Sequence, residues 1–405
     1  MANVSSSNGL EKRPKLRFPG FVEPWKATAF GDIVHEFSNR TKVEDEDVLL
    51  SAAIEGMFLN TELFGHQRGA SNKGYKKIKY GTMVLSTQNL HLGNANVNQR
   101  FEHGMVSPAY KTYDISGCSI DLIAQWIKSD AAKRFFYNAT TVGASVCRRN
   151  VEWDTLYEQS LFLPSLPEQE KIANLLTLLS NRIEKQRQLI IALKKYKRGL
   201  LFREFAPFVH DASDIEYEGK IHDFFSLSSG STPSSTNKAF YSGSIRWVSS
   251  GELKPKYLYE TNQHISSEAA SMCNLREYPA NTLLIAMYGL EAAGVRGTAS
   301  ILGVPSTISQ ACMAIQQTGE IDVEYLYYWY IYNGQWIGIR IAQGTKQQNL
   351  STDTLGNLKI NAPSLSKQKE VCKLLSHIDN RIEKENQKLD LLTSIKRGLL
   401  HQLFM

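Results

Sequence analysis

The chain has 405 residues, 42% hydrophobic and 21% charged, which allows two or three globular domains and excludes a disordered or fibrous protein. The formal net charge of +6 only mildly favours an anionic partner. Five scattered cysteines without a CxxC pair argue against a zinc site or a disulfide framework and fit a reducing compartment.

The chain opens with a polar stretch, MANVSSSNGLEKRPKLRF, which is expected to be loose and does not resemble a secretory signal. The most apolar run, residues 326–342, is interrupted by Asn333, Gly334 and Arg340, so it does not predict a membrane span. We therefore expect a cytoplasmic protein that makes no membrane contact.

Residues 1–163 predict a first globular domain of the α+β class. Short β-branched or aromatic runs alternate with Gly, Ser and Asn turns, and one or two helical segments accompany them. A Gly/Asn-rich stretch that begins at Arg68 contains several lysines and Tyr75, and two adjacent arginines follow Gly143.

Residues 164–205 predict one long helix. Ser165 and Glu168 have the spacing of a capping box, and Pro167 falls in the first turn, where its missing N–H costs nothing. Apolar residues then recur at alternating steps of four and three, which is typical of a heptad seam. The predicted seam positions are Ile172, Leu176, Leu179, Ile183, Gln186, Ile190, Leu193 and Leu200.

Residues 206–362 predict a second α+β domain that is weakly similar to the first. Gly81-Thr-Met-Val-Leu is similar to Asn281-Thr-Leu-Leu-Ile, and Asp121-Leu-Ile-Ala-Gln-Trp is similar to Val323-Glu-Tyr-Leu-Tyr-Tyr. The loops between these landmarks differ strongly. Two related frames with different loops indicate two recognition tasks.

Residues 363–405 repeat the long helix. With Pro164 aligned to Pro363, the segments run without a gap to Phe205 and Phe404, and about 19 of the 42 paired positions are identical. The second set of seam positions is Val371, Leu375, Ile378, Ile382, Glu385, Leu389, Leu392 and Leu399.

A duplicated chain with one helix per half can adopt a pseudo-two-fold arrangement, which makes the helices antiparallel. We therefore predict two globular domains separated by two long helices that form an antiparallel coiled coil. The alternative is that each helix packs only on its own domain. Because the helices carry more positive charge than the whole chain, the globular parts are nearly neutral, and bulk attraction to phosphates contributes little.

Several motifs occur in a fixed order around the second helix: GSTPSS at 230–235, YSGSIRWVSSGEL at 241–253, GTKQQNLS at 344–351 and APSLSKQKEV at 362–371. With LPSLPEQEKIANLL at 163–176 and YKRGLL at 196–201, they resemble the specificity subunits of type I restriction–modification systems. The resemblance covers nearly the whole chain, and the order of the motifs is more specific than any one of them. The first half departs at residues 143–150, a segment longer than its counterpart.

The resemblance implies that each globular half is a target recognition domain that reads one half of a bipartite double-stranded DNA sequence. It implies that the helix pair sets the spacer and docks two modification subunits, which carry S-adenosylmethionine and methylate adenine at N6. Restriction subunits, which are translocase-nucleases that use ATP and Mg²⁺, can join the assembly. No cofactor is expected on this chain.

Basic and amide side chains on loops are the candidates for DNA contact, because Arg and Lys suit phosphates and guanine edges and Gln suits adenine. Solvated loops, turns and a core tryptophan are the alternative interpretation. The candidates are Arg68, Lys73, Tyr75, Lys76, Lys77, Lys79, Arg148, Arg149, Ser231, Thr232, Arg246, Lys254, Lys256, Tyr257, Arg296, Lys346, Gln347 and Gln348.

Two Lys-Arg pairs near the helix ends, Lys197-Arg198 and Lys396-Arg397, are candidates for partner binding. They also have the positive charge that complements a helix C-terminus.

No catalytic or metal-ligating residues are predicted on this chain. The sequence has no GxxxxGK[ST] loop, no Asn-Pro-Pro-Tyr-like tetrad and no HExxH motif. Glu252-Leu-Lys254 matches only the tail of a nuclease ExK pattern. Two alternatives stay open besides an independent nuclease: a specificity subunit whose partner fuses methylase and nuclease, and a coiled-coil scaffold that does not bind DNA.

Overall fold

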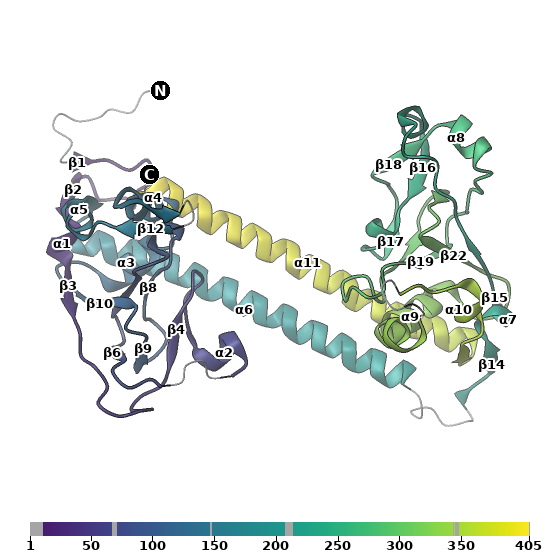
Figure 1. Ribbon diagram of the computed structural model, residues 1–405, viewed down its shortest axis with the longest axis horizontal. Helices are drawn as coiled ribbons and strands as arrows, with labels where there is room; N and C mark the ends of the chain where they lie inside the picture. The colour runs from purple at the N-terminus through teal and green to yellow at the C-terminus, as the bar shows by residue number, and fades with distance from the viewer. Residues whose placement is uncertain are drawn as a thin grey trace. The chain divides into compact units, whose positions relative to one another are not determined.

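The computed structural model describes residues 11–66, 71–145, 148–206, 214–342, 344 and 348–404. It divides into two compact units: unit 1 contains the chain up to Gln188 together with the segment from Gln387, and unit 2 is Leu189–Asn386. Both boundaries fall inside the long helices α6 (Leu166–Phe205) and α11 (Leu365–Phe404), which are drawn in Figure 1. Each unit therefore contains a globular part and about one half of each long helix. The unit boundaries do not coincide with the ends of the helices.

Unit 1 is built on a four-stranded antiparallel sheet in the order β3-β10-β7-β8, with smaller sheets β1-β2-β13, β4-β5, β6-β9 and β11-β12 (Figure 1). Its strands are β1 (Glu11–Lys12), β2 (Trp25–Ala29), β3 (Val34–Phe37), β4 (Leu50–Ala52), β5 (Met57–Leu59), β6 (Lys76–Lys79), β7 (Met83–Ser86), β8 (Ala95–Val97), β9 (His103–Val106), β10 (Tyr110–Ile115), β11 (Thr140–Ser145), β12 (Arg148–Val151) and β13 (Ser160–Leu163). Its shorter helices are α1 (Phe30–Ile33), α2 (Asn60–Phe64), η1 (Leu90–Leu92), α3 (Ile120–Trp126), α4 (Asp130–Asn138) and α5 (Trp153–Glu158).

Unit 2 is built on a five-stranded sheet in the order β15-β22-β19-β20-β17, with smaller sheets β18-β16-β21 and β14-β23. Its strands are β14 (Tyr217–Lys220), β15 (Phe225–Ser229), β16 (Ile245–Val248), β17 (Tyr257–Leu258), β18 (Gln263–Ile265), β19 (Leu283–Ala286), β20 (Ala299–Leu302), β21 (Thr307–Ile308), β22 (Cys312–Gln317) and β23 (Lys359–Ala362). Its shorter helices are α7 (Ile221–Phe224), η3 (Lys238–Tyr241), η4 (Ser250–Glu252), α8 (Ser267–Met272), α9 (Val323–Trp336), the π-helix η5 (Ile337–Ile341) and α10 (Thr352–Gly356).

The two central sheets repeat one another. Strands β3-β10-β7-β8 correspond in order to β15-β22-β19-β20, and all of these neighbours pair antiparallel. Gly81 and Asn281, at the turns before β7 and β19, have positive φ angles of 84° and 65°. Gly and Asn are the residues that accept this conformation most readily, so the similarity seen in the sequence marks a shared turn.

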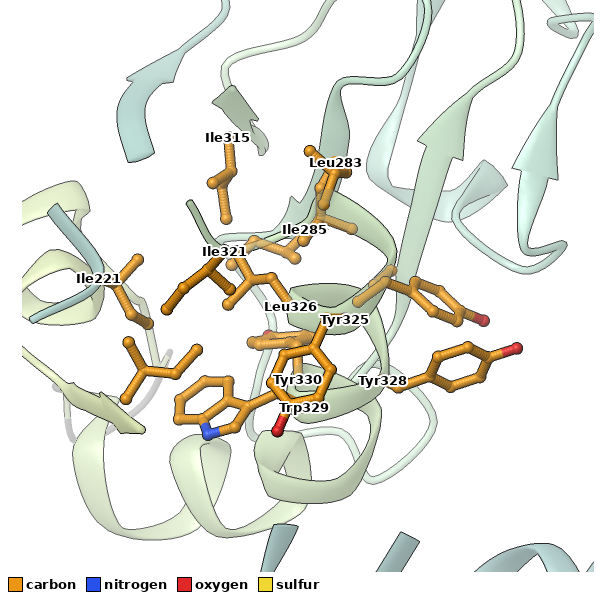
Figure 2. Packing of buried hydrophobic residues seen from close by; sticks show 14 of the residues in the cluster. Ile221, Leu283, Ile285, Ile315, Ile321, Tyr325, Leu326, Tyr328, Trp329 and Tyr330 are labelled. Atoms are coloured by element: carbon orange, nitrogen blue, oxygen red, sulfur yellow. The ribbon is translucent and has the colours of Figure 1, made fainter. Parts of the chain in front are cut away.

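Each central sheet is buried on both faces, and alternate residues serve different cores. In unit 1, Met83 and Leu85 face the helices, whereas Val84 packs on the other side with β4, β5, β6 and β9. In unit 2, Leu283 and Ile285 face α9, as Figure 2 shows, while Leu284 packs on the other side. We call the structure on this second side the outer layer: β4, β5, β6 and β9 in unit 1, and β16, β18, β21 and residues 249–256 in unit 2.

The long helices run antiparallel within each unit. In unit 1, the Lys396 ammonium donates to the Ser180 hydroxyl at 2.6 Å, and in unit 2 the Lys197 ammonium lies 2.5 Å from the Asp379 carboxylate. Since Lys197 aligns with Lys396 and Ser180 with Asp379 in the repeat, the same contact occurs once per unit. Every predicted seam residue is buried or half-buried. The predicted α+β fold with two long helices is confirmed.

A buried glutamine joins the start of each long helix to the helix that follows each central sheet. The Gln169 side chain accepts from the Ser119 backbone N–H at 2.8 Å, and Gln368 accepts from the Asp322 N–H at 2.8 Å. Each glutamine also donates to the carbonyl of the proline before its own helix, at 2.9 Å. Ser119 and Asp322 are the N-caps of α3 and α9. Aligning these N-caps pairs Asp121 with Glu324, one residue away from the pairing with Val323 that the sequence suggested.

The expectation of a loose start is wrong for the described part of the N-terminal segment. Residues 11–12 form β1 on β2, and the Lys12 ammonium donates to the Phe404 carbonyl at 3.0 Å. The Arg17 guanidinium donates to both oxygens of Glu168, at 2.9 and 2.6 Å. Glu168 therefore pairs with Arg17 instead of completing a capping box with Ser165. None of the helices in the described ranges is long and apolar enough to cross a membrane.

Candidate DNA interface

The basic stretch of unit 1 includes a hydrogen-bonded turn that presents Lys73. The Thr41 N–H donates to the Tyr75 carbonyl at 2.8 Å, and the Gly74 N–H donates back to the Thr41 carbonyl at 3.1 Å. Lys73 is exposed at the tip and Tyr75 is half-buried. Arg40 donates to the Gly74 carbonyl at 3.2 Å, which brings a second cation to the turn. The sequence did not indicate Arg40, because it comes from a distant strand end; Arg68 lies outside the described residues.

The lysines of β6 divide between the surface and the interior. Lys77 and Lys79 point outward and form ion pairs, with Glu46 at 2.7 Å and Asp114 at 3.1 Å. The hydrogen bond from Lys77, with a backbone N–H bond, lowers the pKa of Glu46 to about 2. Lys76 is 5% exposed, and its ammonium donates to the Tyr110 carbonyl at 2.8 Å. The prediction of Lys76 as a DNA contact therefore conflicts with its position, because the strand alternation turns its side chain inward.

The GSTP motif of unit 2 packs closely against the outer layer. A Cβ on Gly230 would lie 2.0 Å from the Ile308 carbonyl oxygen, so only glycine fits there. Trp247 is buried, and its indole N–H donates to the Ser231 carbonyl at 3.1 Å. Trp247 thus belongs to the core, as the alternative interpretation held. Around it, Thr232 is exposed, while Ser231 and Arg246 are half-buried.

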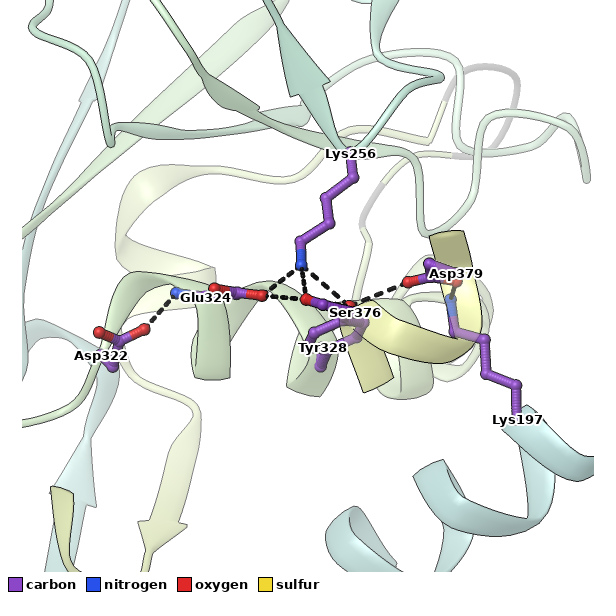
Figure 3. Close-up of polar contacts among 7 residues, drawn as sticks. All are labelled: Lys197, Lys256, Asp322, Glu324, Tyr328, Ser376 and Asp379. Carbon is purple, nitrogen blue, oxygen red and sulfur yellow. Dashed lines mark hydrogen bonds and ion pairs between the residues drawn. The ribbon is translucent and has the colours of Figure 1, made fainter. Parts of the chain in front are cut away.

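Lys254 is exposed, but Lys256, two residues later, faces the helices (Figure 3). The Lys256 ammonium donates to the Tyr328 hydroxyl at 2.9 Å and is also bonded to Glu324 and Ser376. An ammonium has three N–H donors, and all three are used. The prediction of Lys256 as a DNA contact is therefore contradicted by its bonds. Tyr257 is partly exposed, and burial, together with the nearby Glu324, raises its pKa to about 12.

Arg149 is held by the hairpin on which it lies. Its guanidinium donates to the Thr140 hydroxyl and carbonyl at 2.7 and 2.6 Å, and it lies 4.2 Å from the centre of the Tyr137 ring. These contacts use some of the N–H donors of Arg149 and orient the remaining ones. Arg148 begins β12, and its side chain lies outside the described part of the structure.

Arg296 and Gln348 stabilise two loops of unit 2 that meet beside α9. The Arg296 guanidinium donates to the carbonyls of Leu290 and Glu291 at 2.6 and 2.8 Å. The Gln348 backbone N–H donates to the Glu291 carboxylate at 2.9 Å, and this bond lowers the pKa of Glu291. The predicted contacts Lys346 and Gln347 lie outside the described residues. What the structure shows for Arg296 is therefore a role in holding the loop.

In both candidate Lys-Arg pairs, the lysine and the arginine differ in exposure. Lys197 and Lys396 are half-buried and make the helix–helix bonds given above, so their charges face the partner helix and not the solvent. Arg198 and Arg397 are exposed on the same helices. Of these four residues, only the two arginines face outward.

Lys128, directly after α3, has a role that the sequence did not indicate. Its ammonium donates to the Ile54 carbonyl at 2.8 Å, the Ala95 carbonyl at 3.1 Å and the Asn96 side-chain oxygen at 2.5 Å. Burial lowers the pKa of Lys128 to about 8. The acceptors lie far away in the chain, so a lone lysine after a helix gives no local signal of this arrangement.

The lowered pKa predicts a pH-dependent contribution to stability. The folded chain loses the Lys128 proton near pH 8, whereas the unfolded chain keeps it until about pH 10.4, so unfolding takes up a proton between these values. From pH 7 to pH 9, the unfolding free energy of the wild type should rise by about 1 kcal/mol relative to Lys128→Met. Urea unfolding at both pH values measures the difference. The exposed Lys15→Met is the control. An equal change of unfolding free energy with pH in the wild type and in Lys128→Met would contradict the prediction.

Glu252, the carboxylate of the partial nuclease pattern, has a structural role. One of its oxygens accepts from the Ser249 N–H at 2.9 Å and the other accepts from the Asn262 N–H at 2.6 Å. Within the described ranges, no group of three or more His, Cys, Asp and Glu side chains could hold a metal ion. The exposed basic side chains Lys79 and Lys254 stay candidates for DNA contact.

Comparison with known proteins finds relatives in sequence and in fold. The family model for the type I restriction modification DNA specificity domain matches residues 213–394. The MjaIX specificity subunit of Methanocaldococcus jannaschii, a type I restriction enzyme, is 28% identical over 190 residues, which are 46% of this chain and only 43% of that relative.

Two solved structures share the fold over nearly the whole chain. The crystal structure of the type I restriction-modification S subunit from M. genitalium gives a TM-score of 0.61 at 16% identity and covers 97% of this chain and 99% of that one. A chain from a type I restriction–modification system, solved to explain complex assembly and conformational transition, gives 0.58 at 14% identity and covers 96% and 99%. Residues 213–394 therefore contain the type I restriction modification DNA specificity domain, and nearly the whole chain has the fold of the type I S subunits.

Proposed function

We propose that this chain selects the DNA target of a type I restriction–modification complex, with each outer layer reading one half of a bipartite double-stranded sequence. The observation that carries the proposal is the combination of two matching sheets with two dissimilar outer layers. β6-β9 and β4-β5 cover the sheet of unit 1, while β18-β16-β21 covers that of unit 2. Similar central sheets that carry dissimilar outer layers fit a protein that reads two different half-targets.

The exposed candidates include Lys79 and Lys254 in the outer layers, and Lys73 and Thr232 in loops that adjoin them. Few base contacts are needed per half-target, since a good bidentate pair discriminates by about 1–3 kcal/mol. Phosphate contacts orient the protein on the duplex and carry no sequence information directly. The ion-paired Lys79 would exchange Asp114 for a phosphate on binding.

In the same proposal, the helix pair sets the spacer and docks two modification subunits. Support comes from apolar side chains that are exposed at repeat-related positions: Leu175 matches Leu374, and Tyr196 matches Ile395. Arg198 and Arg397 provide matching charges. A surface that occurs twice suits two copies of one partner. S-adenosylmethionine, used for adenine-N6 methylation, and the ATP and Mg²⁺ of restriction subunits then belong to the partners, and this chain has no catalytic role.

Methylome sequencing of a strain that carries this chain and its modification partner tests the proposal. We expect methylated adenines in a two-part sequence with a fixed gap. Replacing residues 1–163 with those of another family member should change one part and leave the other part and the gap intact. A scaffold that does not bind DNA predicts no dependence of the sequence on this chain. A change in both parts would contradict the assignment of one half-target to each unit.

A further inference from the structure

A lysine crosses the same edge of the repeated sheet in each unit. In unit 1 this edge is β8, and in unit 2 it is β20, the counterpart of β8, extended by β17. Lys128 starts on the helix side, after α3, and its ammonium reaches the outer layer. Lys256 starts in the outer layer, before β17, and its ammonium reaches the helix side.

Lys128 fixes the turn between β4 and β5. Its ammonium bonds the Ile54 carbonyl in that turn, while its two other bonds go to Ala95 and Asn96 in β8. Asn96 is buried, and its side-chain amide donates to the Ala53 carbonyl at 2.8 Å. Lysine and asparagine thus bind the same turn, and every ammonium donor of Lys128 has an acceptor.

Lys256 fixes the segment that presents Lys254. The backbone of this segment is bonded to the sheet, since the Ile301 N–H donates to the Lys256 carbonyl at 2.7 Å. Its ammonium bonds Glu324 and Tyr328 on α9 and Ser376 on α11, as Figure 3 shows.

The network of Lys256 extends to both long helices. The Tyr328 hydroxyl donates to Asp379 at 2.9 Å, and Asp379 pairs with Lys197 of α6. Burial works to raise the pKa of Glu324, but the bonds from Lys256 and Ser376 outweigh it and lower that pKa. The carboxylate is therefore charged at neutral pH and holds the ammonium.

In the described part of unit 1, the counterpart of this network contains no charged group from the outer layer. Gln125 occupies the place of Tyr328, six residues after the N-cap, and contacts Thr177 and Ser180 of α6 at 3.4 Å. Among the described residues of unit 1, the lysine that crosses the edge is Lys128, from the opposite side. Two unrelated sequence positions thus make the same connection between layers.

We propose that Lys128 and Lys256 are positioning residues, each of which fixes the DNA-reading layer of its unit on the helix-side core by crossing the shared sheet edge. The inference rests on the proposed function. Neither ammonium has a donor left for DNA, so each acts through the groups it holds. Base recognition needs side chains placed within about 0.5 Å, and an outer layer that shifts on its support loses selectivity first.

The test compares methylation of the cognate target with targets that carry one altered base, using the assembled complex. Lys128→Met should lower selectivity about tenfold or more in one half-target, and Lys256→Met/Glu324→Gln should do so only in the other. The double variant avoids leaving the Glu324 charge unpaired. The salt dependence of binding should stay as in the wild type, whereas loss of a phosphate contact, as we expect for Lys254→Met, reduces the salt slope by about one.

Lys133→Met and Lys359→Met are matched controls on the exposed surface of the two units and should leave selectivity unchanged. Thermal unfolding of every variant separates positioning from loss of fold, and Ser376→Ala provides a milder change to the same network. Folded variants with wild-type selectivity, an equal loss in both half-targets, or a reduced salt slope would overturn the proposal. If the wild type itself selects no two-part sequence, the proposed function fails. That outcome is distinguishable from failure of the positioning proposal, in which the wild type is selective and the variants are equally selective.

Discussion

Insertion of seven residues into both long helices should move the gap between the two half-targets or abolish methylation. The insertion points are set by the unit boundaries, after Gln188 and after Asn386. Insertion there keeps the contacts of Lys396 with Ser180 and of Lys197 with Asp379 inside their own units. Seven residues keep the heptad phase and lengthen each helix by about 10 Å.

On DNA, about 10 Å corresponds to about three base pairs. The original target should then lose methylation, because the two readers no longer meet their grooves together. A gap about three base pairs longer is the expected replacement where the rotation of the duplex can be accommodated. Methylome sequencing measures both outcomes. The same insertion in only one helix is the control, since it breaks the pairing between the helices, and an unchanged target in the doubly inserted chain would refute the role of the helices as a spacer.

The helices were predictable because their pattern is local and repeated. A heptad spacing states which side chains are buried without reference to the rest of the chain. Ile172 and Val371, for example, are 0% and 5% exposed. The duplicated sheets were visible through turns such as Gly81 and Asn281, which share a conformation despite different side chains. The register of α3 against α9 was missed by one residue, because it is fixed by Gln169 and Gln368, which are distant in sequence.

The fate of individual lysines could not be predicted from the sequence. Lys76 and Lys77 are neighbours in a basic stretch, yet the buried Lys76 donates to the Tyr110 carbonyl and Lys77 donates to the Glu46 carboxylate at the surface. Lys256 finds acceptors on α9 and α11, about 70 to 120 residues away. Only the tertiary structure brings such distant acceptors to a lysine. A cluster of lysines in the sequence therefore identifies a basic region, but it does not show which lysines are free to contact DNA.

The N-terminal segment should prove essential to the stability of unit 1, although its sequence looks like a loose tail. Glu168 is 1% exposed, and both of its carboxylate oxygens are bonded by Arg17. Arg17→Ala leaves a buried charge without a partner, so we expect a loss of about 3–5 kcal/mol in unfolding free energy. Urea unfolding combined with hydrogen exchange of the first turns of α6 measures the loss and assigns it to unit 1.

Two further variants separate the buried charge from the rest of the segment. Arg13 is exposed and bonds only the Val22 carbonyl among the contacts described, at 2.6 Å, so Arg13→Ala should change stability by about 0.5 kcal/mol or less. Arg17→Met/Glu168→Leu replaces both charges with apolar side chains and should recover most of the loss. If Arg17→Ala unfolds like the wild type, or if the double variant is no more stable than the single one, the buried ion pair does not anchor the segment.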